Sequence, residues 1–248
     1  AGEKVRSLNK PMMVTEEQFD SLLKAIRQYG HPVSLSDAVR NIRQGCDFRP
    51  GTVAVTFDDG YYDFYLRAFP LLREYGIPAT LFLTTGVIGR RNEYLWWDEF
   101  DYYAGVRHEP AFQVPQDASP ELQHALRLIE RLPDNRTEAV EAQIRDALNR
   151  VTPAERERFI TGIRAAVPGN DPRPRLMLTW DNVREISGHV EIANHTVSHY
   201  LLDRLDAAAV REEITGASET IHRETGQHCK GMAYPAGVFS PDVAKIAG

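Results

Sequence analysis

The sequence predicts an α/β fold on parallel strands, with a block of helices inserted into it. Two observations lead to this prediction. Segments of apolar and β-branched residues alternate with segments of helical periodicity, which is the order found in βαβ units. Two of the strand-like segments, residues 52–57 and 79–85, have no polar face, as expected for strands buried on both sides of a parallel sheet.

The first elements are predicted from local capping signals. Thr15 and Gln18 have the spacing of a capping box, so we expect a helix from there to about Tyr29. Residues 32–35 predict a short strand, and Ser36 predicts the N-cap of a second helix. The buried face of the first helix is expected to contain Phe19, Leu22, Leu23 and Ile26.

The next segment predicts a βαβ unit. A strand at 52–57 ends at Asp58-Asp59-Gly60, and a helix follows at about 62–75. Gly76 is expected to end this helix, because glycine readily adopts the left-handed conformation of a C-cap. A second buried strand at 79–85 completes the unit.

Residues 92–175 differ in character and predict a helical insertion. The stretch is rich in Arg, Glu, Ala and Leu, with helical periodicity at 122–129 and 140–148 and prolines between the pieces. Near its start stands the aromatic pair Trp96-Trp97, and such residues more often anchor a core than line a cleft. Trp97 is also a candidate substrate-binding residue, if this start of the insertion lines a cleft.

The α/β pattern then resumes. Thr179 predicts the N-cap of a short helix, and residues 190–193 predict a strand that ends at Asn194-His195. A helix is expected over 206–225, and a last short strand over 231–234. The final residues have the pattern of another helix beginning.

Composition excludes some classes of partner. The 248 residues carry a net charge of −6 with both signs interspersed, which argues against a nucleic-acid groove or an anionic membrane surface as partner. We find no apolar run of the roughly 18–20 residues that a transmembrane helix needs. Cys46 and Cys229 are compatible with one disulfide or with two thiols, and neither is expected to bind metal. Compartment and oligomeric state stay open.

Polar residues follow three of the predicted strands at the point where each strand ends. They are Asp58-Asp59, His195 and Tyr234-Pro235. In parallel α/β folds the carboxyl ends of the strands meet at one edge, where active sites collect. The sequence therefore predicts that separate strands deliver these residues to one cleft.

The aspartate pair predicts a cation. Adjacent strand residues point to opposite faces, so both carboxylates reach one site only if the chain turns, which Gly60 permits. Two neighbouring carboxylates repel each other unless a cation neutralises one of them. A metal ion on Asp59 would do so and leave Asp58 able to accept a proton. The alternative to a metal site is a simple turn with an Asx cap, which is what an isolated Asp-Asp-Gly forms in most chains.

His195-Thr196-Val197-Ser198-His199 predicts the other ligands. The i, i+4 spacing would place both imidazoles on one side of a helical turn, where they can share an ion. Such a pair alone is more often structural, but here it shares an edge with Asp59. Together they predict one divalent ion bound by two nitrogens and one oxygen. Zinc is the default, and Co, Ni or Fe also suit this set.

These segments resemble the motifs of a known family. Thr56-Phe57-Asp58-Asp59-Gly60, with Gly76-Ile77-Pro78-Ala79-Thr80 after it, resembles the first motif of the polysaccharide deacetylase family (NodB homology, carbohydrate esterase family 4). His195-Thr196-Val197-Ser198-His199 is similar to the second motif. Met232-Ala233-Tyr234-Pro235-Ala236-Gly237 is similar to the third. The resemblance covers roughly residues 11–91 and 176–246.

The resemblance implies a fold and a reaction. The fold would be a distorted, incomplete (β/α) barrel with fewer than eight strands, forming one domain over 1–248. The reaction would be hydrolytic deacetylation of N-acetylated amino sugars in a polysaccharide or oligosaccharide, such as an exopolysaccharide or a cell-envelope glycan. The implied roles are base for Asp58; metal ligands for Asp59, His195 and His199; an oxyanion-hole amide for Tyr234; and substrate contact for Tyr234 and Pro235.

The chain departs from the family pattern in three ways. Ala233 stands where many members have an arginine that orients the base, and Ala236 stands where an aromatic residue is common. The histidine general acid is expected beyond Gly248, in a continuation of the chain or from another chain. Two alternatives stay open: a metal-dependent hydrolase of a non-glycan amide or imide, and a carbohydrate-binding accessory protein that retains the metal but has lost the acid.

Overall fold

The computed structural model describes residues 14–89, 94–100, 118–130, 138–166 and 175–248. They fall into two compact units. The first, which we call the α/β unit, contains the described residues of 14–93 and 173–248. The second, the helical unit, contains those of 94–172, the stretch where the helical insertion is expected. That both belong to one domain stays a prediction.

The chain begins with a capped helix. Helix α1 (Glu16–Tyr29) follows the N-cap Thr15, whose reciprocal bonds with Gln18 confirm the predicted capping box. Its buried residues are Phe19, Leu23 and Ile26. Leu22 is 52% exposed, so the buried face is narrower than predicted.

The next helix begins earlier than predicted. Helix α2 (Leu35–Arg43) follows strand β1 (His31–Pro32), and its N-cap is Ser34, not Ser36. The Ser34 hydroxyl accepts the backbone N–H of Asp37 at 3.1 Å and donates to the Asp37 carboxylate. Ser36 has no carboxylate three residues later to form the same pair.

The predicted strand at 52–57 forms as two short strands. Strand β2 (Thr52–Val53) pairs in parallel with β1, and β3 (Val55–Phe57) pairs in parallel with β4 (Ala79–Leu83). The prediction that it is buried on both sides is wrong, because Thr56 is exposed. Within the described residues β3 is an edge strand of the sheet β3-β4-β5, so only β4 pairs with it.

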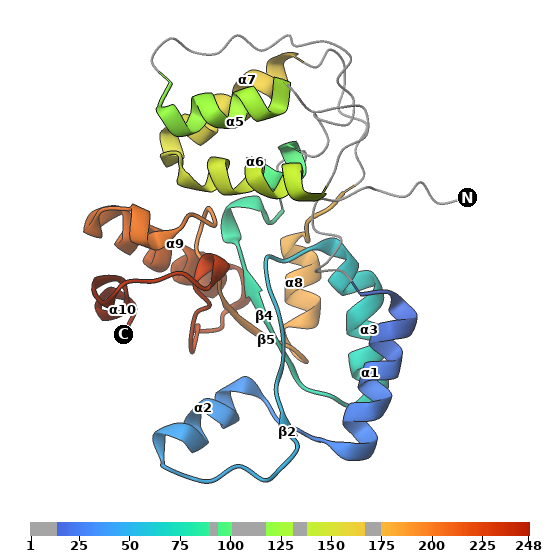
Figure 1. Cartoon of the computed structure of the whole chain (residues 1–248). Helices are drawn as coiled ribbons and strands as arrows, with labels where there is room; N and C mark the ends of the chain where they lie inside the picture. The colour runs from blue at the N-terminus through green and yellow to red at the C-terminus, as the bar shows by residue number, and fades with distance from the viewer. Residues whose placement is uncertain (1–13, 90–93, 101–117, 131–137, 167–174) are drawn as a thin grey trace. The chain divides into compact units, whose positions relative to one another are not determined.

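The rest of the βαβ unit is confirmed. Its helix consists of a π-helical turn η2 (Phe64–Ala68) that continues into α3 (Phe69–Tyr75), and Gly76 ends it in the left-handed region at φ 60°. All residues of β4 are buried. Helix α3 packs beside α1 (Figure 1).

The second half supplies the remaining strand and its covering helices. Strand β5 (Glu191–Asn194) pairs in parallel with β4, and the predicted strand at 231–234 is reduced to one bridge between Met232 and Asn194. Helix α9 packs against β5 and α10 (Figure 1). The helices of this half are α8 (Trp180–Ile186), η4 (Leu202–Arg204), α9 (Ala207–Thr225), η5 (Pro235–Gly237) and α10 (Pro241–Ala247), with the short η3 (Thr85–Val87) after β4.

The strand pairing confirms an α/β fold with parallel strands. The named strands form the pair β1-β2 and the three-stranded sheet β3-β4-β5, and every ladder in them is parallel. Because parallel neighbours share a direction, β3 and β5 end at the same edge of the sheet. Closure of these strands into a barrel stays a prediction.

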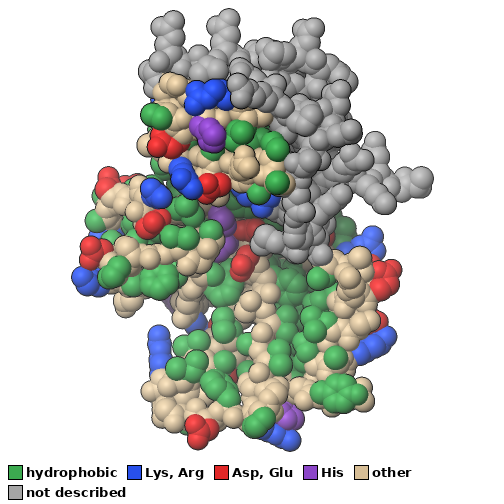
Figure 2. Space-filling model, viewed as in Figure 1, with side chains coloured by type: hydrophobic (Ala, Val, Ile, Leu, Met, Phe, Trp, Pro, Cys, Tyr) green, Lys and Arg blue, Asp and Glu red, His purple; other side chains and the backbone are tan. Residues whose placement is uncertain are grey.

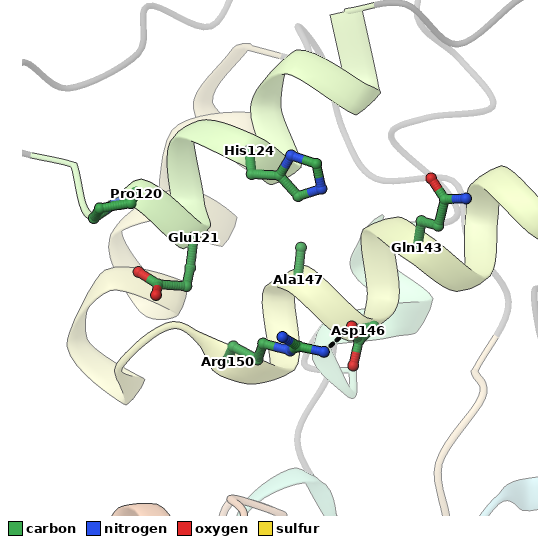
Figure 3. Close-up of a pocket in the computed structure, with 7 residues that line it drawn as sticks. All are labelled: Pro120, Glu121, His124, Gln143, Asp146, Ala147 and Arg150. Carbon is green, nitrogen blue, oxygen red and sulfur yellow. Dashed lines mark hydrogen bonds and ion pairs between the residues drawn. The ribbon is translucent and has the colours of Figure 1, made fainter.

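The helical unit contains α5 (Pro120–Glu130), α6 (Glu138–Arg150) and α7 (Pro153–Ala166), and residues 96–100 are also helical. Helices α5 and α6 pack together and line a pocket of about 320 Å³ (Figure 3). Trp97 is buried, with its ring edge-on to Trp96 at 5.5 Å. Burial of this kind is what a core anchor shows.

The distribution of charged side chains on the surface agrees with what the composition predicts. On the face in Figure 2, acidic and basic side chains are interspersed over the described residues rather than gathered into a basic stripe. Of the helices in the described ranges, none has both the length and the apolarity to cross a membrane. Cys46 and Cys229 are free thiols.

Candidate metal centre

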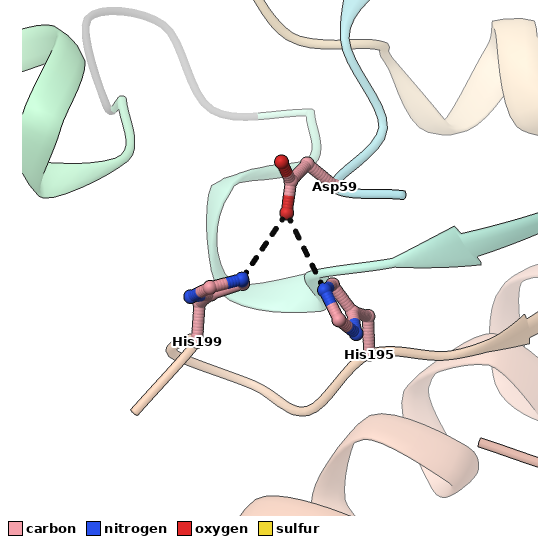
Figure 4. Close-up of side chains that lie close together, drawn as sticks. All are labelled: Asp59, His195 and His199. Atoms are coloured by element: carbon pink, nitrogen blue, oxygen red, sulfur yellow. Dashed lines mark ion pairs between the residues drawn. The ribbon is translucent and has the colours of Figure 1, made fainter. Parts of the chain in front are cut away.

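The three predicted ligands converge on one point in the α/β unit (Figure 4). Asp59 Oδ1 lies 3.6 Å from His195 Nε2 and 3.4 Å from His199 Nε2. Two ligands that each lie about 2.1 Å from a tetrahedral ion are separated by about 3.4 Å. The donor atoms and their spacing therefore fit a divalent ion such as zinc.

A sharp turn after β3 presents Asp59. Gly60 N–H donates to the Asp58 carbonyl at 2.9 Å, and Asp59 itself has φ 72°. Aspartate tolerates this left-handed region better than most residues do. Gly60 has φ 95°, which favours glycine, and a Cβ there would lie 2.7 Å from the end of the Ile88 side chain, which would have to shift.

His195 is held in the tautomer that a metal needs. Its Nδ1 lies 2.9 Å from the Ala233 carbonyl oxygen, which can only accept, so Nδ1 carries the proton and the Nε2 lone pair faces Asp59. Burial lowers the pKa of His195, although the Ala233 carbonyl and the charge of Asp58 act in the opposite direction. The lowered pKa favours the neutral imidazole, which is the form that binds a metal.

The predicted helical turn at residues 195–199 is wrong. This segment, which we call the histidine loop, is irregular, and Thr196 and His199 have positive φ values of 70° and 54°. Thr196 N–H donates to Asn194 Oδ1 at 2.6 Å, and His199 N–H donates to Thr196 Oγ1 at 3.0 Å. Side-chain oxygens thus replace the carbonyl acceptors of a helix.

The segment after β4 fixes the other side of the histidine loop. Thr85 N–H donates to the Thr196 carbonyl at 3.1 Å, and Gly86 N–H donates to the Val197 carbonyl at 2.8 Å. A Cβ on Gly86 would lie only 2.5 Å from the same Val197 oxygen. Glycine at 86 is therefore what allows the two backbones to approach this closely.

We expect Gly86→Ala to push the histidine loop away and to destabilise the protein by about 1–3 kcal/mol, the usual cost of overpacking. Denaturant unfolding measures the stability, and zinc titration should show weaker binding. Gly188→Ala is the matched control, because a Cβ there meets no atom within 4 Å. Equal effects of the two substitutions would contradict a specific role of Gly86.

The structure also describes the other predicted site residues, which are Asp58, Tyr234, Pro235 and Trp97. Asp58 is exposed, directly before Asp59, and its charge acts on His195. Tyr234 is half-buried and directly follows Ala233, whose carbonyl holds His195, while Pro235 is buried. Trp97 belongs to the helical unit, so its contact with substrate stays a prediction.

Backbone strain is concentrated in the three motifs. Among the described residues, the non-glycine positions with positive φ are Asp59, Thr196, His199 and Ala236. Each belongs to one of the three segments singled out in the sequence. Sparsely populated backbone conformations of this kind cluster at functional sites.

Two supporting side chains were not predicted from the sequence. Asn194 holds the histidine loop as described above, and Glu213 on α9 accepts the N–H groups of Val197 and Ser198. A signal for Glu213 was available. It shares one helical face with the buried residues Val210, Ala217 and Ile221, and a carboxylate on such an apolar face needs a partner.

Comparison with known proteins places these features in a family. The family model described as polysaccharide deacetylase matches residues 46–116 and 133–248, which is more than half of the chain. A poly-β-1,6-N-acetyl-D-glucosamine N-deacetylase of Staphylococcus aureus is 32% identical over 84 residues, covering 34% of this chain and 29% of that protein. The chain thus spans less than a third of the length of this relative.

Two solved structures share the fold. The deacetylase PplD of Streptococcus pyogenes, in complex with acetate, aligns with a TM-score of 0.57 and 16% identity over 98% of this chain and 74% of its own. IcaB of Ammonifex degensii aligns with a TM-score of 0.54 and 18% identity over 94% of this chain and 71% of its own. With the family match and the three motifs, the conclusion is that this chain belongs to the polysaccharide deacetylase family.

Proposed function

We propose that the protein is a metal-dependent deacetylase that hydrolyses the acetamide groups of N-acetylated amino sugars in a polysaccharide. The observation that carries the proposal is the convergence of Asp59, His195 and His199, with Asp58 next to them. The proposed barrel, with fewer than eight strands, would present this edge of the sheet to the glycan.

The ligand set supports a single divalent ion. Asp59, His195 and His199 would hold it, and an ion in this position supplies Lewis-acid chemistry for the acetamide carbonyl and for a water molecule. Zinc is proposed first, with Co, Ni or Fe as substitutes, because two nitrogens and one carboxylate oxygen suit all four.

Two groups of the chain would act in the other steps of the hydrolysis. Asp58 accepts a proton as water attacks the acetamide carbonyl carbon, and the Tyr234 backbone N–H donates to the oxyanion that forms. The C–N bond then breaks, releasing acetate and leaving the amine on the sugar. The leaving nitrogen needs a proton, and the family resemblance implies that a histidine supplies it.

The proposed substrate class follows from the relative. The Staphylococcus aureus protein is named for poly-β-1,6-N-acetyl-D-glucosamine, which makes β-1,6-linked N-acetylglucosamine oligomers the first substrates to try. Tyr234, Pro235 and Trp97 are the residues proposed to contact the sugar.

The test is acetate release from β-1,6-linked and β-1,4-linked N-acetylglucosamine oligomers by the purified protein. We expect release with zinc present, loss to background after chelation and recovery when zinc, cobalt or nickel is added back. Acetate should form in equal amount with free amine, which a fluorogenic amine reagent measures.

The outcomes separate the alternatives. A zinc-loaded protein that binds these glycans but releases no acetate would favour the accessory carbohydrate-binding function. A zinc-loaded protein that hydrolyses cyclic imides or ureides instead would favour the non-glycan amide hydrolase. Acetate release that survives complete metal removal would refute the proposed mechanism.

A further inference from the structure

The histidine loop is held by a distinctive set of hydrogen bonds. All five of its backbone N–H groups donate, and only the first, that of His195, donates to a backbone carbonyl. The other four donate to side-chain oxygens, so side chains supply most of the acceptors for the loop's N–H groups.

Glu213 accounts for two of these four bonds. A single carboxylate oxygen, Oε2, accepts Val197 N–H at 2.9 Å and Ser198 N–H at 2.8 Å. The residue is 9% exposed and lies in the middle of α9 (Ala207–Thr225). Of the three side chains that accept loop N–H groups, it alone lies outside residues 194–199. The two amides that it binds lie between the two histidine ligands.

Helix α9 is itself tied to the end of β5. Asn194 Nδ2 donates to the Ile214 carbonyl and to Ser218 Oγ, each at 2.8 Å. Gly216 faces the Val197 side chain, where a Cβ would approach it to 3.3 Å. These contacts hold helix α9 against the histidine loop. Glu213 then connects the helix to Val197 and Ser198, which lie between the two histidine ligands.

We propose that Glu213 is a positioning residue for the metal centre, and that its carboxylate sets the separation of His195 and His199. The inference rests on the proposed metal site, although it does not require deacetylation. Removing an outer group that orients ligands typically weakens metal affinity about 10–100-fold.

Three substitutions separate hydrogen bonding from charge. Glu213→Leu keeps the size of the side chain but removes both acceptors. Glu213→Gln keeps an oxygen at full reach and removes the charge, so it can still accept both N–H groups at one atom. Glu213→Asp keeps the charge but is one methylene too short to reach both. Glu212→Ala, at the exposed neighbouring position, is the matched control.

The measurement is zinc affinity by competition with a chromophoric chelator, on variants whose folding is checked by circular dichroism. We expect about 10–100-fold weaker zinc binding for Glu213→Leu, a smaller loss for Glu213→Asp, and near wild-type affinity for Glu213→Gln and Glu212→Ala. In the metal-free protein, hydrogen exchange at the Val197 and Ser198 amides should be faster in the Leu and Asp variants only.

Several results would overturn the proposal. Wild-type affinity in a folded Glu213→Leu protein would do so; if that variant does not fold, wild-type affinity in Glu213→Asp would do so equally. Strong binding by the Asp variant with weak binding by the Gln variant would assign the effect to charge and not to position. A wild-type protein that binds zinc but releases no acetate would refute only the proposed function, while one that binds no zinc would refute both.

Discussion

His199→Ala is expected to lower zinc affinity by more than about 100-fold, beyond the range seen for groups outside the ligand shell, and to reduce acetate release to background. His199 supplies one of the three ligand atoms and lies 3.4 Å from Asp59 Oδ1. The two remaining ligands would hold the ion much more weakly than three. Zinc competition titration and an acetate assay measure the two effects on the same sample.

The control for this substitution is His189→Ala. His189 is an exposed histidine of the same unit and lies outside the converging set, so zinc affinity should not change. If His199→Ala retains the affinity of the wild type, the proposed ligand set is incorrect. Loss of affinity with full retention of acetate release would instead show that the ion is not catalytic.

Asp58→Asn is expected to lower kcat/KM for acetate release by about 10²–10⁴-fold, the usual contribution of a positioned base. Asparagine has nearly the same shape as aspartate but cannot accept the proton from water. Zinc affinity should stay close to that of the wild type, because Asp58 is not among the converging ligands. Metal binding and turnover should thus separate in this variant, in contrast to His199→Ala.

Asp47→Asn is the matched control, because it makes the same chemical change at an exposed residue outside the three motifs. Unchanged turnover in Asp58→Asn would rule out Asp58 as the base. A parallel loss of zinc would place Asp58 among the ligands instead.

The secondary structure was predictable where its signals are local. Thr15 with Gln18 marks one helix end and Gly76 another, each through bonds within a few residues, and the structure confirms both. The error at Ser36 was avoidable by the same reasoning, because only Ser34 has an acidic partner three residues later.

The exposure of β3 could not be predicted in the same way. A run of β-branched residues indicates a strand, but whether Thr56 is covered depends on which strands and helices reach it from elsewhere. That information belongs to the tertiary structure.

For the site, the sequence identified which residues meet but not how the backbone brings them together. Convergence of Asp59, His195 and His199 follows from parallel strands that end at one edge. The left-handed turns do not follow from spacing, because the histidine loop relies on Glu213, a side chain from helix α9. A spacing of four residues suits a helix equally well, which explains the wrong turn type.

The discontinuity of the α/β unit has a consequence for the order of folding. Its two parts are separated in the chain by the helical unit, and pairing of β4 with β5 joins Thr80 to Glu191. Such long-range pairing is slow, because the entropy of closing a large loop is lost before any contact forms. Compaction of the intervening helices would shorten the effective loop. During synthesis, Asp59 leaves the ribosome before His195 and His199 are made, so we expect the metal centre to form late in folding.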